Sequence, residues 1–383
     1  MMHQSNSQFS FCPHFQACAG CVEHLSHNPP PIWEEVLSFF LQLPTPSFHA
    51  GLPIHWRHRA KLAVRGTSET PLIGLFKEHS HDVASIPQCL VHHPHLNKAF
   101  DIVREWMKQH KIDPYQEHSR RGELRYLQGV VERKSGRVQL SFVLNASASD
   151  ILLDRWGSLL VELSQEHPLL WHSLWINFND QATNTIFGSD WMCAWGEKDL
   201  WEAFGDVDVC YGPASFGQAN LLLFERMLFR LQQLIPFGAR VAEFYAGVGA
   251  IGLCIASRSE WVCCSEINPF AEAYFHKARS KLKEKVANRL SFLTSSTKGG
   301  LSILENATTV IVDPPRKGLD PTFFSALNKA CSIQDLFYIS CGWEGFKRDY
   351  QQLFEQGWKV HSVDGYHFFP GSNHVELLVN FKR

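Results

Sequence analysis

The sequence of 383 residues lacks the long apolar run that a membrane-spanning helix needs. A span needs about 18 consecutive apolar residues with few or no charges, and no such stretch occurs. The first sixteen residues, MMHQSNSQFSFCPHFQ, also lack the cationic start and apolar core of a secretory signal. These two absences predict a soluble, cytoplasmic protein without a membrane partner.

The chain also has little net charge and no internal repeat. Its formal charge of −2 says little about partners, because basic residues concentrate in runs 55–65, 118–137 and 276–289. Such runs are compatible with a nucleic-acid partner, and three solvated surfaces explain them equally well. With 45% apolar and 19% charged residues, the chain is globular, and its length allows two or three domains.

Eleven cysteines occur without an export signal, which argues against a disulfide framework. Cys12, Cys18 and Cys21 have the spacing C-x5-C-x2-C, and Cys89 follows further along the chain. Four thiolates suit a [4Fe–4S] cluster or a zinc ion. Because zinc sites more often consist of two C-x2-C pairs, the three-plus-one pattern favours the cluster. Unligated cysteines are the alternative.

Three domains are expected along the chain. Residues 1–48 hold the first three cysteines, and residues 49–205 mix strand-like runs such as AKLAVRG with helical stretches near 95–111 and 150–166. That pattern indicates an α+β domain. In residues 206–383 strands alternate with helices, which predicts a mostly parallel, doubly wound α/β sheet. Ligands of such sheets bind at the carboxyl ends of the strands.

A Gly-rich turn follows the first strand of this last region. Gly247, Gly249 and Gly252 form GxGxxG, and Glu266 follows the next strand. The pattern fits NAD and S-adenosylmethionine alike, since glycines admit the ligand to the backbone and a carboxylate can hold ribose hydroxyls. A second acid, Glu243, favours the methyl donor, because its ammonium and sulfonium groups can use another negative charge.

Three later positions carry reactive groups at strand ends. Asp313 precedes Pro314 and Pro315 after one strand, in a loop typical of enzymes that grip a flat base. Cys341 lies between a strand and a helix, where the helix dipole is expected to lower the pKa of its thiol. Glu376 opens the final strand. Taken singly, a buried cysteine and a surface glutamate are the simpler interpretations.

Together these groups match methylation of a pyrimidine at carbon 5. That carbon is a poor nucleophile until a thiolate adds to carbon 6, and a base must then remove the carbon-5 proton. Cys341 is the predicted nucleophile and Glu376 the predicted base.

From Cys12 to the C-terminus the sequence resembles the bacterial RNA uracil-C5-methyltransferases. WRHRAKLAVRG, PLIGLF and RRGELRY are distinctive to the branch with an iron–sulfur cluster and no TRAM module, which acts on 23S rRNA. Only eleven residues precede Cys12, which leaves no room for that module. The resemblance implies a Rossmann-like class I methyltransferase domain, a central RNA-binding domain and an N-terminal iron–sulfur segment, with no obligate protein partner.

The resemblance also implies roles for matching positions. Gln218, Tyr245 and Glu266 would contact S-adenosylmethionine beside Gly247 and Gly249, and Asp313 would lie between cofactor and uracil. Cys341 and Glu376 would be nucleophile and base. The cluster ligands would be Cys12, Cys18, Cys21 and Cys89.

Several positions depart from the family pattern. Glu243 replaces an Asp and Tyr245 a Phe, Gly342-Trp343 follows the nucleophile where an Asn is usual, and His367 replaces another Asp. Three other functions therefore stay open: methylation of a tRNA uridine, RNA binding with an altered active site, and an NAD-dependent oxidoreductase. The last rests only on GxGxxG and Glu266.

Overall fold

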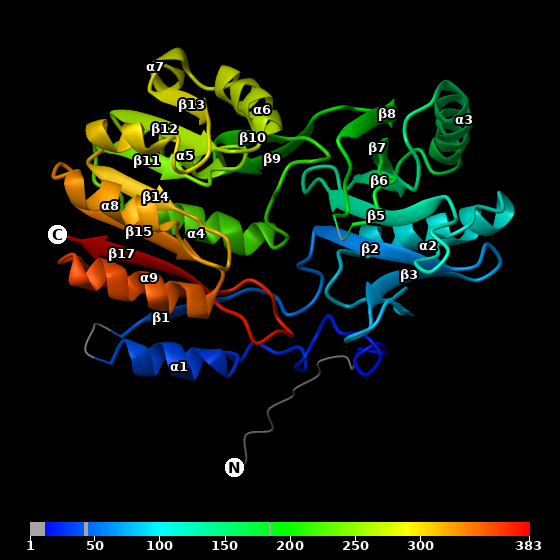
Figure 1. Ribbon diagram of the computed structural model, residues 1–383, viewed down its shortest axis with the longest axis horizontal. Coiled ribbons are helices and arrows are strands. Elements are labelled where there is room, and N and C mark those ends of the chain that lie inside the picture. Colours follow the sequence, from blue (N-terminus) through cyan, green and yellow to red (C-terminus); the bar gives the residue numbers. More distant parts are fainter. Residues whose placement is uncertain (1–11, 42–44, 184) are drawn as a thin grey trace, which may run out of the picture. The chain divides into compact units, whose positions relative to one another are not determined.

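A computed structural model describes residues 12–41, 45–183 and 185–383 (Figure 1). The chain divides into two compact units. The first unit consists of the chain up to Asn28, Leu52–Lys198 and Pro370–Ser372. The second unit consists of Pro29–Gly51, Asp199–Phe369 and Asn373–Arg383. This differs from the three expected domains 1–48, 49–205 and 206–383. Residues 29–51 belong with the C-terminal part because Ser47–Ala50 pair with its sheet.

The first unit contains a seven-stranded sheet of order β4-β3-β2-β5-β6-β7-β8. Its elements are β2 (Arg59–Gly66), β3 (Pro71–Phe76), β4 (Val83–Ser85), α2 (Pro94–Gln109), β5 (Leu124–Val131), β6 (Val138–Leu144), α3 (Asp150–Glu166), β7 (Trp171–Phe178) and β8 (Asp190–Gly196). Only β6 and β7 pair in parallel, since α3 connects them. This is the α+β arrangement that the sequence predicts.

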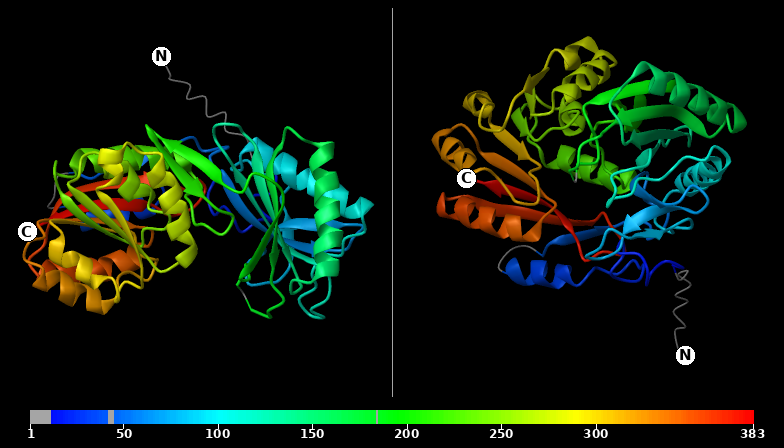
Figure 2. Two further views of the ribbon diagram at one scale, coloured as in Figure 1. Left: turned by 90° about the horizontal axis from the view of Figure 1, so that it is seen from above. Right: turned by 45° about the vertical axis from the view of Figure 1, so that its right-hand side comes forward.

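Both long helices of this unit cover the same face of its sheet (Figure 2). Trp106 of α2 and Trp156 of α3 meet in one core cluster, with ring centroids 5.8 Å apart. The helix α2 begins where Pro94 follows His93, whose imidazole accepts a hydrogen bond from the His95 N–H. Proline suits the first helical position because its missing N–H has no intrahelical partner there.

The second unit contains an eight-stranded sheet of order β1-β16-β17-β15-β14-β11-β12-β13 and a β9-β10 hairpin. Its strands are β1 (Ser47–Ala50), β9 (Leu200–Phe204), β10 (Val207–Tyr211), β11 (Arg240–Phe244), β12 (Trp261–Glu266), β13 (Leu290–Thr294), β14 (Thr309–Val312), β15 (Asp335–Ser340), β16 (Lys359–His367) and β17 (Glu376–Lys382). Its helices are α1 (Ile32–Phe39), α4 (Leu221–Leu234), α5 (Ala250–Ile255), α6 (Pro269–Ser280), α7 (Glu284–Ala287), the 3-10 helix η1 (Leu301–Asn306), α8 (Pro321–Lys329) and α9 (Trp343–Glu355).

The strands β11 to β15 are all parallel, and β17 is inserted antiparallel between β15 and β16. Helices cover both faces (Figure 2), and α1, η1, α8 and α9 share one core cluster. With both faces covered, central strands such as β14 are wholly buried and wholly apolar apart from Thr309. The doubly wound sheet is therefore confirmed, and the carboxyl ends of its parallel strands share one edge.

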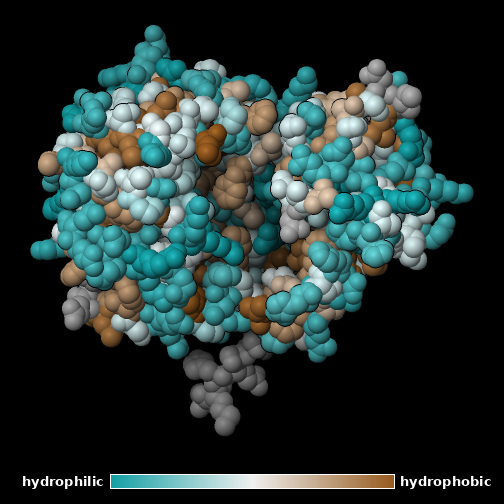
Figure 3. All heavy atoms as spheres, viewed as in Figure 1, coloured by the Kyte–Doolittle hydropathy of each residue, from teal (hydrophilic) through white to brown (hydrophobic). Residues whose placement is uncertain are grey.

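The face shown in Figure 3 is mainly hydrophilic, with apolar residues in small groups. Within the part of the chain that the structure describes, no helix combines the length and the apolar character needed to cross a membrane.

Candidate active site

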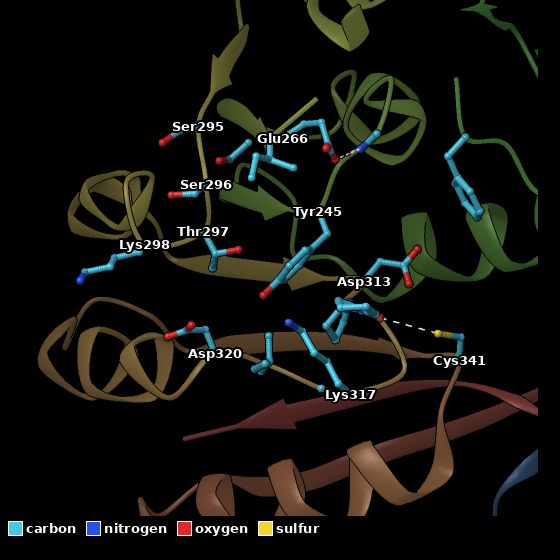
Figure 4. A pocket seen from close by; sticks show the side chains of 18 of the residues that line it. Tyr245, Glu266, Ser295, Ser296, Thr297, Lys298, Asp313, Lys317, Asp320 and Cys341 are labelled. Atoms are coloured by element: carbon cyan, nitrogen blue, oxygen red, sulfur yellow. Dashed lines mark hydrogen bonds between the residues drawn. The ribbon is translucent and has the colours of Figure 1, made fainter. Parts of the chain in front are cut away.

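A cavity of about 730 Å³ lies at the carboxyl ends of the parallel strands of the second unit (Figure 4). Seven of the eight predicted site residues outside the cysteine cluster line it, Gly247 and six residues with side chains. The six are Gln218, Tyr245, Glu266, Asp313, Cys341 and Glu376. They come from loops and strand ends separated by up to 158 residues in sequence, and the sheet topology brings them together.

Glu266 ends β12 and supports the Gly-rich turn. Its two carboxylate oxygens accept hydrogen bonds from the backbone N–H groups of Gly247, at 2.9 Å, and Asn268, at 2.8 Å. A Cβ added at Gly247 would meet nothing within 4 Å, so its backbone faces open space in the cavity. A ligand can therefore approach both the turn and the carboxylate.

Gly249 is the predicted site residue that does not line this cavity. It caps α5 with a φ of 74°, and an added Cβ would lie 2.5 Å from the ring of Phe275. Only glycine combines this backbone conformation with such a close approach. The residue serves the packing of the turn against α6.

Tyr245 has a φ of 61°, which is rare for a residue with a large side chain. The left-handed conformation costs roughly 1–2 kcal/mol. Its ring points into the cavity (Figure 4), where burial raises the pKa of the phenol and hydrogen bonding with Thr297 and the Asp320 backbone opposes the rise. Such strain persists where surrounding contacts fix it, and it is common at functional sites.

A partly buried and a buried carboxyl group, those of Asp313 and Glu376, act on the thiol. Burial raises the pKa of Asp313 to about 7. Burial, followed by the charge of Asp313, raises the pKa of Glu376 to about 8, and the Arg316 guanidinium opposes this rise. Both groups therefore exchange protons near neutral pH, which is the property that acid–base catalysis requires.

The pKa of Cys341 is raised to about 11, and the expected lowering by the helix dipole is wrong. Burial is the largest cause, followed by the charges of Asp313 and Glu376; Arg316 acts in the other direction. The Sγ atom lies 3.7 Å from the carbonyl oxygen of Pro314, to which the thiol donates. Cys341 is thus a neutral thiol at rest, poised against the Asp313-Pro314 loop.

Glu243 does not face the large cavity. It lines a smaller pocket beside Gln218, Tyr245 and Asp313, and it accepts a hydrogen bond from the Cys264 thiol at 3.1 Å. Burial raises its pKa to about 8. The side chain is therefore mainly protonated at neutral pH, which weakens the charge argument drawn from the sequence.

Several residues of the wall were not predicted. Ser295, Ser296, Thr297 and Lys298 follow β13, and Lys317 and Asp320 follow the Asp313 loop. The rule that ligands bind at the carboxyl ends of strands could have found the first group, because β13 is a parallel strand of the same sheet.

Comparison with known proteins places the chain in a family. Across its full length the chain is 48% identical to an uncharacterized RNA methyltransferase of Protochlamydia amoebophila, which it covers completely. The chain belongs to the RNA methyltransferases. Residues 300–383, which include Asp313, Cys341 and Glu376, match the family model described as tRNA (Uracil-5-)-methyltransferase.

One more distant relative agrees with this assignment, and one solved structure shares the fold. An uncharacterized RNA methyltransferase of Clostridium acetobutylicum is 25% identical, over 86% of this chain and 71% of its own length. The crystal structure of Pyrococcus abyssi tRNA (uracil-54, C5)-methyltransferase in complex with S-adenosyl-L-homocysteine has a TM-score of 0.75 at 23% identity. It covers 95% of this chain and 86% of the archaeal one. The Rossmann-like methyltransferase fold of the second unit is thereby confirmed.

The four predicted cluster ligands of the methyltransferase line one cavity of about 180 Å³ in the first unit, together with Arg57 and His92. Burial, followed by the charges of Cys89, Cys18 and Cys12, raises the pKa of Cys21 to about 12. The cysteine loop is anchored by the Gly371 carbonyl, which accepts hydrogen bonds from the N–H groups of Val22 and Glu23. The thiols thus influence one another electrostatically across a shared space.

The basic residues of the methyltransferase's three runs differ in exposure and in ion pairing. Arg121 is exposed, whereas Arg125 is buried and donates to the carbonyls of Asn179 and Gln181. In the run 276–289, Lys277 pairs with Asp199 and Lys281 with Asp208. Much of this third run is therefore engaged within the second unit.

Proposed function

We propose that this chain transfers a methyl group from S-adenosylmethionine to carbon 5 of a uridine in 23S rRNA. The observation that carries the proposal is the shared cavity, which has a thiol and two titratable carboxyl groups on its wall beside a Gly-rich turn. This set of groups suits pyrimidine C5-methylation and leaves an NAD-dependent oxidoreductase without a use for Cys341 or Glu376.

The wall residues fit the methyl donor. Glu266 would hold the ribose hydroxyls, the open backbone at Gly247 would admit the ligand, and Gln218 and Tyr245 would contact it from the other loops. S-adenosylmethionine supplies a methyl group made electrophilic by a positively charged sulfur. Asp313 would lie between that group and the uracil.

In the reaction we infer, the Cys341 thiol first loses its proton to water. The sulfur then bonds to carbon 6 of the uracil, and the electrons of the C5=C6 bond form an enolate. Carbon 5 of the enolate takes the methyl group as the bond from that group to the sulfonium sulfur breaks, which leaves S-adenosylhomocysteine. Glu376, as a carboxylate, removes the carbon-5 proton. The released electron pair restores the C5=C6 bond and expels the Cys341 sulfur.

We further propose a [4Fe–4S] cluster held by Cys12, Cys18, Cys21 and Cys89. Their shared cavity supports it, as does their spacing. Among the described residues, no three His, Cys, Asp or Glu side chains lie close enough to hold a single metal ion. Four thiols around one cavity suit a [4Fe–4S] cluster or a zinc ion, and the three-plus-one spacing in the sequence favours the cluster. No redox step occurs in the reaction above, so the cluster would serve structure or RNA positioning.

Residues 49–205 would be the RNA-binding domain, with RNA lying across the exposed parts of the runs 55–65 and 118–137. A tRNA uridine is the second candidate substrate. The match of residues 300–383 to the tRNA (Uracil-5-)-methyltransferase model favours it, whereas the four cysteines and the sequence segments around them favour 23S rRNA.

The proposal predicts opposite outcomes for two variants. Cys341→Ala should abolish tritium release from RNA labelled at carbon 5 of uridine, because no adduct can form. Glu376→Gln should instead trap methylated RNA covalently on the protein, because the carbon-5 proton stays in place. Denaturing electrophoresis detects that adduct.

Cys331→Ala is the matched control, since this thiol is exposed and does not line the cavity. It should leave tritium release unchanged. Full turnover by Cys341→Ala would remove this residue as the nucleophile.

A further inference from the structure

A second cavity, of about 310 Å³, shares the Cys341 wall with the first. Its other walls include Arg316, Trp343 and His374, none of which lines the large cavity. The thiol therefore separates two spaces. The large cavity carries the Gly-rich turn and Glu266, and the second carries neither.

Trp343 is held firmly in the wall of this second cavity. It is the first residue of α9, and its Nε1 donates to a carboxylate oxygen of Glu35 on α1 at 3.3 Å. Its ring stacks on that of Phe346, with the planes 14° apart and the centroids 5.8 Å apart. An indole fixed in this way loses little conformational entropy when a flat ligand stacks on it.

The wall of the cavity also carries a cation, the Arg316 guanidinium. Its charge opposes the rise in the pKa of Cys341 and of Glu376, and it adds to burial in lowering the pKa of His374. The carboxylate of Glu344 at the rim pairs with Lys347 at 2.7 Å. A guanidinium beside an indole suits a phosphate joined to a nucleobase.

Gly342 allows the Arg316 backbone to pack closely against the loop that carries Cys341. A Cβ at this position would lie 2.8 Å from the carbonyl oxygen of Arg316 and 2.9 Å from its Cα. Any larger residue would push the Arg316 backbone away from Cys341. The Gly342-Trp343 pair therefore departs from the family pattern at both residues. The glycine allows the Arg316 backbone to lie close to the nucleophile loop, and the tryptophan forms the adjoining wall of the cavity.

We propose that this second cavity receives the nucleotide next to the target uridine in the RNA strand, with its base on Trp343 and its phosphate at Arg316. The inference rests on the proposed function, since the target base must reach Cys341 from the RNA side while the methyl donor occupies the large cavity. Trp343 would then be a residue that determines substrate affinity and sequence context.

The test uses short RNAs in which the nucleotide on one side or the other of the target uridine is intact or abasic. Filter binding and single-turnover methylation are measured for the full chain and for Trp343→Ala and Trp343→Phe. Stacking on an aromatic side chain contributes about 1–3 kcal/mol per base, so loss of the base on the stacked side should weaken binding about tenfold or more. Trp343→Ala should show this loss with intact RNA and no further loss with the abasic RNA. Trp343→Phe should restore most of the affinity.

Phe354→Ala is the matched control. Phe354 is an exposed aromatic residue of the same helix that does not line the cavity, and its replacement should change nothing. If the unaltered chain binds intact and abasic RNAs equally, the inference is overturned without any variant. The inference would also be overturned if Trp343→Ala weakened binding of the abasic RNA by the same factor as binding of the intact RNA. Absence of methyl transfer to every RNA would instead count against the proposed function, while the binding series still decides on Trp343.

Discussion

Cys341, Asp313 and Glu376 all hold their protons more tightly than they would in water. Burial is the largest cause for each, and the charges of the two carboxylates add to it for the thiol. The helix dipole that the sequence points to acts in the opposite direction and is outweighed. A thiol that stays protonated at rest is less reactive than a thiolate.

This electrostatic arrangement predicts a rate of methyl transfer that increases with pH. The reaction needs Cys341 as thiolate and Glu376 as carboxylate, and the pKa values of the free site are about 11 and about 8. Raising the pH therefore populates both reactive forms. We expect the single-turnover rate with saturating RNA to increase from pH 6 to pH 9 and to become less steep near pH 8.

The control for this profile is RNA binding measured at each pH in the same buffers. Binding should change much less than the rate over this range. A rate that is independent of pH, or one that falls above pH 7, would contradict the assigned protonation states.

At the scale of elements, the Gly-rich turn depends on close packing between β11, α5 and β12. A Cβ at Gly252 would lie 2.4 Å from the Cys264 sulfur and 2.6 Å from a Glu243 carboxylate oxygen. Gly252→Ala should therefore lower the free energy of unfolding by about 1–3 kcal/mol through overpacking.

Gly157→Ala provides the matched control for that substitution. Gly157 lies within α3, and an added Cβ would meet nothing within 4 Å. Since alanine is the better helix former, this variant should gain about 0.5–1 kcal/mol. Denaturant unfolding measures both, and a neutral Gly252→Ala would contradict the packing described for the turn.

The elements differ in how far the sequence reveals them. The strands that the sequence analysis places before Gly247, Glu266, Asp313 and Cys341 are present as β11, β12, β14 and β15. The four-residue strand β1 is not indicated by the sequence, because its pairing partner lies more than 300 residues away and its side chains are only partly buried. Strand β8 is not indicated either, since it lacks the clear alternation of a half-buried strand.

The candidate site was predictable to a similar degree. The positions of Asp313, Cys341 and Glu376 at strand ends follow from hydrophobic pattern, but their pKa values do not, because burial and neighbouring charges exist only in the fold. The basic runs show the same limit. Arg121 and Arg125 are alike in sequence, and only the fold buries one of them.

Arg121 gives a prediction about the RNA-binding surface. Arg121→Ala should weaken RNA binding and reduce the slope of log affinity against log salt by about 1, because one fewer phosphate is neutralised. Lys283→Ala is the control, as an exposed lysine of the third basic run. An unchanged slope for Arg121→Ala would exclude that contact.

At the scale of the whole molecule, the proposed methyl transfer belongs to the second unit, and the four-thiol cavity lies in the first unit. Cys18→Ser should therefore lower the iron and sulfide content and weaken RNA binding or folding. The single-turnover rate at saturating RNA should change little, because no electron transfer takes part in the reaction.

Cys193→Ser is the control in the same unit, since this half-buried thiol does not line the four-thiol cavity. Iron content equal to that of the unaltered chain in Cys18→Ser would contradict the ligand assignment. A chemical step lost while RNA binding is intact would contradict the structural role of the cluster.

The decisive measurement is methyl transfer from labelled S-adenosylmethionine to 23S rRNA, with tRNA in parallel, followed by nucleoside analysis. We expect label in 5-methyluridine from 23S rRNA, and none when Cys341→Ala replaces the unaltered chain. Label in 5-methyluridine from tRNA alone would keep the reaction and contradict the substrate. Absence of label from both RNAs, with RNA still bound, would contradict the proposed methyl transfer itself and favour an RNA-binding protein with an altered active site.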